Sequence, residues 1–428
     1  MKKLLLLCIV ICGCSTPTPI TQLEDYEVYL RPPSKKEITS LHKNNDFWKQ
    51  KVKSDSTQTI YLSKLAVSEG KLFEAFGTIE NILEANKALE KAVKITDSSQ
   101  VGLLHQLVQN YIQQHRFKDC IPLLDKAESI GYKSKTTQQL LFDIYLELGK
   151  DKTAEIYLER LKNYKDFNYL IRAAKLEDAK GNLNEAISRL ELARKQAEFS
   201  KDKALLLWSY SNLGDFYGHQ GALQKSYQSF LSTLKVQPSN NYALKGIAWL
   251  AFSHEKNTEV AHRILDTLIN RSNKPEYYLF RSKIAYFDKD YTTAKAYEGN
   301  FISKVIKPVY GNMYNSHLLE IYLNSTDTSY HKKALILAKK ELTAVRKTAM
   351  AYSWYARALM VNDQKDKAYS IIKTHVINKT EEPKALFNAA IVLKTNTNDN
   401  TIVAELKNEL MNAFYELGPN YIKPIKAL

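Results

Sequence analysis

Residues Leu207–Asn240, LWSYSNLGDFYGHQGALQKSYQSFLSTLKVQPSN, decide the fold of this 428-residue chain. The stretch predicts two short amphipathic helices joined by a turn at Gly221, because glycine adopts a left-handed backbone without a side-chain penalty. Apolar and small residues recur at helical spacing in each half, so they share one face of each helix. They are Tyr210, Leu213, Gly214 and Tyr217 in the first helix, and Ser226, Phe230 and Thr233 in the second. Pro238 closes the unit.

This order of residues resembles the tetratricopeptide repeat (TPR), a unit of 34 residues that stacks into helical-hairpin solenoids. A large residue, a Leu-Gly pair, a tyrosine, small residues at the helix crossing and a final proline follow one another as in that family. The resemblance implies an all-α solenoid wound as a right-handed superhelix, with a cap at each end. It also implies a scaffold that binds other proteins, but it names no partner.

Related patterns recur along the chain at about the same period, which predicts eight to ten repeats. We expect a cap at the N-terminal end to pack on the first helices, because the end of a solenoid exposes apolar surface. The expected domains are a leader (1–13), a flexible tether (14–22), an N-terminal cap (23–60), the solenoid (61–407) and a C-terminal capping helix (408–428).

The formal charge of the chain is +15, and two of the positive charges lie in the leader. Basic residues gather at Lys49, Lys51 and Lys53, and again along residues 331–347. Such clusters either attract anionic partners or belong to solvated outer faces of helices. The positive charge is spread along the chain, which favours the second interpretation. We therefore expect no nucleic-acid partner.

The first residues have the form of a secretory signal. Lys2 and Lys3 precede an apolar run over residues 4–12, which is too short to span a membrane. The tetrapeptide ICGC at residues 11–14 resembles the lipobox of bacterial lipoproteins, which implies acylation at Cys14. The alternative is an ordinary cleaved signal with an incidental cysteine. Acyl chains would anchor the chain stably in a membrane.

The combined resemblance is to a TPR lipoprotein of a Gram-negative, Bacteroidetes-like cell envelope. Ser15 after the acylated cysteine suits export to the outer membrane, by family analogy. Orientation toward the periplasm or the outside stays open. The one cysteine beyond the leader, Cys120, falls at a small-residue crossing position of its repeat, where a thiol behaves as a small apolar side chain.

Motifs of catalysis and metal binding are missing from the sequence. It contains no HExxH, no Gly-rich phosphate loop, no GxSxG and no pair of CxxC motifs. The closest histidines, His254 and His262, are too far apart to be adjacent ligands on one helix. We therefore expect a non-enzymatic protein without cofactor or metal.

The concave surface of the middle repeats is the predicted binding site. In TPR arrays the first helix of each unit lines this surface, and the positions not used for packing can meet a ligand. Those positions hold aromatic rings interleaved with positive charge, which could hold an acidic or carboxylate-bearing segment. The residues are Trp208, Asp215, His219, Tyr242, Lys245, Trp249, Phe252, Lys283, Tyr286 and Phe287. The rings could instead pack on neighbouring helices or on a cap.

Two functions remain open from the sequence. The first is a protein-protein interaction scaffold, anchored through Cys14, for an envelope protein or peptide in assembly, secretion or transport at the outer membrane. The second is a lipoprotein that binds glycans or peptides in the aromatic groove.

Overall fold

The computed structural model describes residues 19–395 and 400–428, and its regular structure is helical throughout these ranges. The predicted leader and the predicted lipidation site at Cys14 lie outside the described residues. Within the described ranges, no helix has the length and apolarity that a membrane crossing requires.

Consecutive helices pair into ten hairpins over the described residues, at the upper end of the predicted number. The pairs in the N-terminal half are α3 (Thr59–Phe76) with α4 (Ile79–Ile95), α5 (Val101–Gln113) with α6 (Phe117–Ile130), α7 (Ser134–Glu147) with α8 (Asp151–Arg160), α9 (Phe167–Ala179) with α10 (Leu183–Ser200) and α11 (Lys203–His219) with α12 (Leu223–Val236). Those in the C-terminal half are α13 (Asn241–Ser253) with α14 (Thr258–Arg271), α15 (Glu276–Phe287) with α16 (Tyr291–Val305), α17 (Asn315–Asn324) with α18 (Thr328–Lys340), α19 (Ala349–Met360) with α20 (Lys365–His375) and α21 (Pro383–Leu393) with α22 (Asn400–Leu410). The all-α, TPR-like hairpin fold is therefore confirmed.

The α11–α12 hairpin shows why the signature residues matter. Gly221 takes a positive φ of 79° in the turn, as the sequence predicts. Phe230 is fully buried and its ring lies directly on Gly214, where any side chain would overlap it. Ser226 donates a hydrogen bond to the carbonyl of Gly214 at 2.6 Å. Small residues thus let the two helices cross closely, and one aromatic ring fills the space between them.

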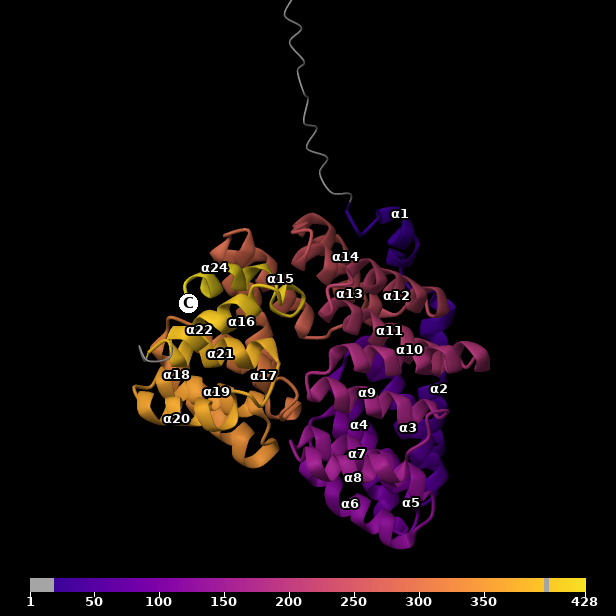
Figure 1. Ribbon diagram of the computed structural model, residues 1–428. Coiled ribbons are helices and arrows are strands. Elements are labelled where there is room, and N and C mark those ends of the chain that lie inside the picture. Colours follow the sequence, from indigo (N-terminus) through magenta and orange to yellow (C-terminus); the bar gives the residue numbers. More distant parts are fainter. Residues whose placement is uncertain (1–18, 396–399) are drawn as a thin grey trace, which may run out of the picture.

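The array bends until its two halves touch (Figure 1). The loop after α14 reaches the end of α3, where Asn273 N donates to Phe76 O at 2.8 Å. Farther along, Lys347 N donates to Leu148 O at 3.2 Å. Backbone contacts between residues about 200 positions apart therefore join the halves, and the inner surface is enclosed rather than open along its whole length.

The N-terminal segment differs from the predicted cap. Only α2 (Lys35–Ser54) packs on the first hairpin, whereas α1 (Leu23–Tyr26) and the 3-10 helix Glu27–Leu30 lie beside α12–α14 (Figure 1). Tyr26 is 1% exposed in the core of those later hairpins. Thr21 is buried as well, so the packed chain begins inside the stretch expected to be a tether. An aromatic ring and a hydrogen-bonding threonine fix this segment, and neither follows the repeat pattern.

The C-terminal segment (residues 411–428) also differs from the prediction of one capping helix. It forms three short helices, α23 (Phe414–Leu417), the 3-10 helix Pro419–Tyr421 and α24 (Ile422–Lys426). Gly418 has a positive φ of 75° and precedes Pro419, so a continuous helix cannot pass this point. The chain turns there and enters the inner surface of the array.

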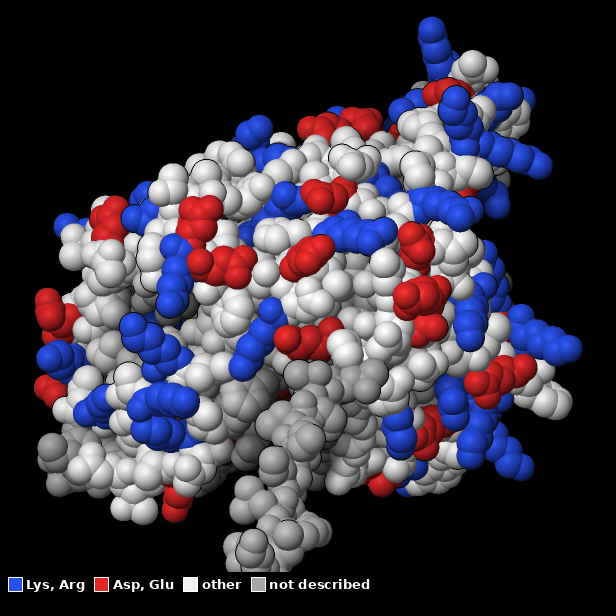
Figure 2. Space-filling model, turned by 90° about the horizontal axis from the view of Figure 1, so that it is seen from above, with Lys and Arg blue, Asp and Glu red and all other residues white. Residues whose placement is uncertain are grey.

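Charges on the molecular surface are mixed. Figure 2 shows lysine, arginine and carboxylate side chains interspersed over the face seen from above. This distribution agrees with the interpretation that most of the positive charge sits on solvated helix faces.

Candidate functional site

The C-terminal segment covers the middle of the inner surface, where the sequence places the binding site. The indole nitrogen of Trp249 donates to the carbonyl of Tyr415 at 2.5 Å. The hydroxyl of Tyr415 donates to Asp215 at 3.3 Å, and its ring lies on Gly218. Predicted binding residues on α11 and α13 therefore contact the chain's own C-terminal segment.

Burial disfavours the charged forms of the titratable side chains at this contact. Burial raises the pKa of Asp215, although hydrogen bonds from Tyr242 and Tyr415 and the charge of Lys245 oppose the shift. His219 Nδ1 lies 3.2 Å from Glu416. Burial lowers the pKa of His219 to about 4. Burial also raises the pKa of Glu416 to about 7, and the negative charges of Glu382 and Asp178 add to this shift. Between about pH 4 and pH 7 both groups of this close pair are therefore mostly neutral.

Some of the predicted residues serve packing. Phe252 is 1% exposed and meets Phe287 edge-on, with ring centroids 5.7 Å apart. Trp208 packs edge-on against Phe167 at 5.8 Å. Tyr242 stays 47% exposed, and Lys245 lies over its ring at 5.1 Å. A role in partner contact stays a prediction for all ten residues.

A cluster of half-buried charges surrounds Lys283, which the sequence did place on the inner surface. Its ammonium lies 3.0 Å from Glu320, and the ammonium of Lys384 lies 3.0 Å from the other oxygen of the same carboxylate. Burial alone would raise the pKa of Glu320, but the two lysines hold it well below its ordinary value. The hydroxyl of Tyr421 donates to Glu320 at 3.2 Å. Sequence reasoning missed Glu320 and Lys384, because each falls in a different repeat and neither belongs to a local motif.

A cavity of about 790 Å³ lies beside this cluster, and we call it the inner cavity. Four predicted residues line it: Trp249, Phe252, Lys283 and Tyr286. Helices α15–α18 contribute most of the remaining wall, and residues 417–421 of the C-terminal segment cover one side. Part of the predicted aromatic and basic run therefore lines the wall of a partly open cavity.

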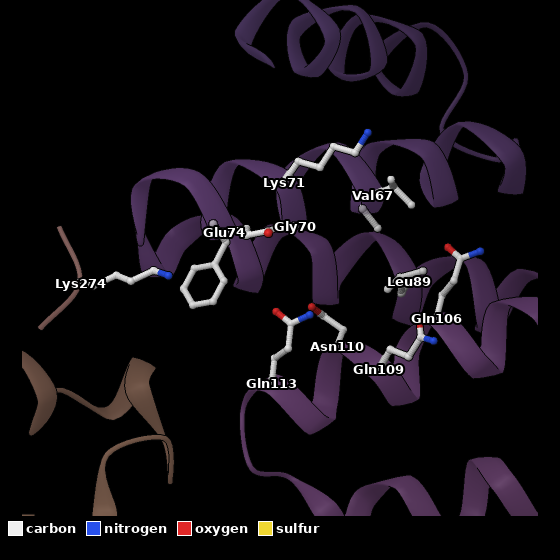
Figure 3. Close-up of a pocket in the computed structure, with 12 residues that line it drawn as sticks. Val67, Gly70, Lys71, Glu74, Leu89, Gln106, Gln109, Asn110, Gln113 and Lys274 are labelled. Carbon is white, nitrogen blue, oxygen red and sulfur yellow. The ribbon is translucent and has the colours of Figure 1, made fainter. Parts of the chain in front are cut away.

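A second hollow stays open on the inner surface of the first two hairpins, and we call it the N-terminal groove (Figure 3). Its volume is about 420 Å³. Helix α3 contributes Val67, Gly70, Lys71 and Glu74, and α5 contributes Gln106, Gln109, Asn110 and Gln113. Lys274 closes one end, from the loop between α14 and α15 (Figure 3). The sequence analysis did not select this groove, since its glutamines give no aromatic or charged signal.

Exposed amides set the chemistry of the N-terminal groove. Gln109 and Gln113 lie one turn apart on α5 and are exposed, and their side-chain amides form no hydrogen bond within the described residues. Beneath them, Asn110 donates to the buried Asn86, which fixes the floor. Burial lowers the pKa of Lys274, although Glu276 opposes the shift. The groove therefore offers free amide donors and acceptors next to a partly desolvated ammonium.

Comparisons with known proteins concern the architecture alone. No protein-family model matches the chain, and no curated protein matches it. Among solved structures, YrrB, a TPR protein with an unusual peptide-binding site, is 18% identical with a TM-score of 0.27, covering 46% of this chain and 95% of YrrB. The human IFIT1 dimer with PPP-AAAA is 15% identical with a TM-score of 0.46, covering 78% of this chain and 76% of that one. These values describe similarity to the fold of TPR-like helical-repeat proteins, and they indicate no ligand for this chain.

Proposed function

We propose that this chain is a non-enzymatic binding scaffold that captures an extended segment of a partner protein in the N-terminal groove. One observation carries the proposal: the middle of the inner surface is covered by the chain's own C-terminal segment, whereas the N-terminal groove is open. An open inner surface on helical hairpins is a place where a peptide can lie along several helices at once.

The lining of the groove suggests which peptide would fit. Val67 is 46% exposed and offers an apolar contact. Gln109 and Gln113 can donate to and accept from a peptide backbone, because their amides have no partner of their own. Lys274 favours a carboxylate at its end of the groove, although the neighbouring Glu74 offsets part of its charge. The proposed ligand is therefore an extended segment with one apolar and one acidic side chain.

The membrane anchor belongs to the same proposal. Acylated Cys14 would hold the scaffold at the cell envelope, in the outer membrane by analogy with other lipoproteins. Seven peptide links separate Cys14 from Thr21, whose backbone N–H donates to Glu255 at 2.7 Å. Such a link spans at most about 25 Å. The hairpins α12–α14 would therefore stay close to the membrane surface.

A blocking substitution tests the groove. Gly70 lies in the α3 wall, and a Cβ added there meets no other atom within 4 Å. Gly70→Trp should fill the groove without disturbing the core, and Gly70→Ala is the matched control. Peptides selected from a random display library on the wild-type chain should bind Gly70→Ala equally and Gly70→Trp at least about tenfold more weakly. Equal binding to both variants would exclude the groove as the site.

A second experiment tests the anchor separately. Cells fed an alkyne-tagged palmitate should label the wild-type chain and leave Cys14→Ser unlabelled and released from the membrane fraction. Cys120→Ser is the matched control, because Cys120 is buried in the fold and should not affect labelling. Labelling that persists in Cys14→Ser would reject the lipid anchor while leaving the peptide groove untouched.

A further inference from the structure

We propose that the inner cavity binds a single-chain amphiphile, a hydrocarbon chain that carries an anionic head group. This site lies apart from the N-terminal groove and adds a second ligand class to the proposed scaffold. At about 790 Å³ the cavity falls within the usual size range of small-molecule sites. The C-terminal segment encloses it on one side through residues 417–421.

The interior of the cavity is predominantly apolar. Aromatic and aliphatic side chains from five helices face it: Trp249, Phe252, Leu279, Ile302, Ile321 and Phe387. Removing apolar surface from water is favourable roughly in proportion to its area, so such a wall favours an apolar ligand body.

Several polar groups on the wall already have partners inside the protein. The hydroxyl of Ser282 donates to the carbonyl of Ala294 at 2.9 Å. The side-chain amide of Asn420 donates to the carbonyl of Lys283 at 2.7 Å, and the charge of Lys283 is paired with Glu320. A ligand rich in hydroxyls, such as a glycan, would lose its hydration here without gaining equivalent hydrogen bonds. The cavity therefore favours a hydrocarbon over a sugar.

Lys295 places an ammonium group at the edge of the inner cavity. Lys295 on α16 lines the cavity, is exposed, and forms no ion pair within the described residues. The nearest acidic side chain on its helix, Glu298, accepts a hydrogen bond from the hydroxyl of Tyr286 at 3.4 Å. Burial raises the pKa of Glu298, although the hydrogen bond from Tyr286 and the charge of Lys295 oppose the shift. An anionic head group at Lys295 would gain a charge-assisted contact while its chain lies along the aromatic wall.

Dodecanoate and dodecan-1-ol, titrated calorimetrically as monomers into the purified chain, test the proposal. Both should bind the wild type, because both carry the hydrocarbon chain. Lys295→Gln should weaken dodecanoate about tenfold and change dodecan-1-ol less than about twofold. Loss of both ligands in Lys295→Gln, or of neither, would overturn the assigned head-group contact.

Gly299 gives the matched pair for the cavity itself. It lines the wall, and a Cβ added there meets no atom within 4 Å. Gly299→Trp should reduce binding of both ligands at least about tenfold, while Gly299→Ala should retain it. Peptides that depend on the N-terminal groove should bind both variants equally, so failure of one site is distinguishable from failure of the other.

Hydrogen exchange provides a readout that needs no variant. Dodecanoate should slow exchange of the backbone amides in residues 415–421, because a ligand in the cavity orders the segment that encloses it. Unchanged exchange at saturating dodecanoate, absence of binding to the wild type, or preferential binding of an oligosaccharide that Gly299→Trp removes would each overturn the proposal.

Discussion

The indole nitrogen of Trp249 donates a hydrogen bond to the backbone carbonyl of Tyr415 across 166 positions of the sequence. This bond fixes the C-terminal segment on the inner side of α13. The ring of Tyr415 covers Gly218 on α11, and Gly418 lies against the ring of Trp249. The middle of the array is therefore closed by the chain itself, which directs a partner to the N-terminal groove.

Gly218→Ala should destabilise the protein. Glycine-to-alanine in a helix normally raises the free energy of unfolding by about 0.5–1 kcal/mol. At Gly218 the added methyl group would overlap ring carbons of Tyr415, so we expect a loss of about 1–3 kcal/mol instead. Urea denaturation measures the difference. Gly70→Ala is the control, because its methyl group meets no atom within 4 Å and it should show the normal gain. Equal behaviour of the two variants would mean that Tyr415 does not pack on α11.

Local sequence patterns predicted the hairpins but not what covers them. Gly214, Ser226 and Phe230 act within one hairpin, so their spacing could be read directly from the chain. The partner of Trp249 lies 166 positions away, and no local periodicity encodes that distance. The sequence placed Trp249 on the inner surface, but its aromatic character could not distinguish contact with a ligand from contact with the chain's own C-terminal segment.

The N-terminal groove was missed for a related reason. In the sequence, Gln109 and Gln113 are ordinary helix-surface residues. They line a groove only because the fold brings Lys274, from the loop between α14 and α15, to its end. The bend that brings them together depends on contacts such as Asn273 to Phe76. Those contacts arise from the sum of small rotations along the array, which a single repeat does not specify.

Glu416→Gln should remove a pH dependence of stability. The pKa of Glu416 is raised from 4.5 to about 7 in the fold, chiefly by burial. The folded state therefore holds the proton more tightly, and its contribution is fully present below pH 4.5 and lost as the pH rises to about 7. The contribution is at most about 3 kcal/mol. Glutamine keeps the shape and can still donate to His219, but it does not titrate.

Urea denaturation at pH 4.5, 6 and 8 measures this effect. The free energy of unfolding of the wild type, minus that of Glu416→Gln, should fall across the range and level off above pH 7. Glu259→Gln serves as the control, since Glu259 is exposed on α14. A difference that rises with pH would show that Glu416 is an ionised partner of His219 rather than a neutral one.

Glu320→Leu should be among the most damaging single substitutions. It leaves Lys283 and Lys384 in a partly desolvated site without the carboxylate that both contact at 3.0 Å. Removing one partner from a fully buried charge cluster typically costs about 3–5 kcal/mol, and because these side chains keep 17–35% exposure we expect about 2–3 kcal/mol. Chemical denaturation checks the loss against Glu84→Ala, which breaks an exposed pair with Lys87 and should change stability by less than about 1 kcal/mol. A loss that small for Glu320→Leu would mean that water reaches the lysines.

Glu255→Ala should release the N-terminal segment without unfolding the array. The carboxylate of Glu255 accepts hydrogen bonds from both the backbone N–H and the hydroxyl of Thr21, each at 2.7 Å. Without these bonds the buried ring of Tyr26 should leave its site more often, and chymotrypsin should cleave after it faster than in the wild type. Mass spectrometry of the fragments, with Glu259→Ala as the control, measures this rate.

Release of this segment would change how far an anchored scaffold can extend from the membrane. With Thr21 fixed, the link from Cys14 is at most about 25 Å long, but release of the segment as far as α2 at Lys35 lengthens it to about 75 Å. Glu255 would then control how far the N-terminal groove can move from the membrane. Cleavage at the same rate in Glu255→Ala and Glu259→Ala would show that other contacts hold the segment without Glu255. These include the ring of Tyr26 and the hydrogen bonds from Arg271 to the carbonyls of Tyr29 and Arg31, and the distance limit would then depend on them.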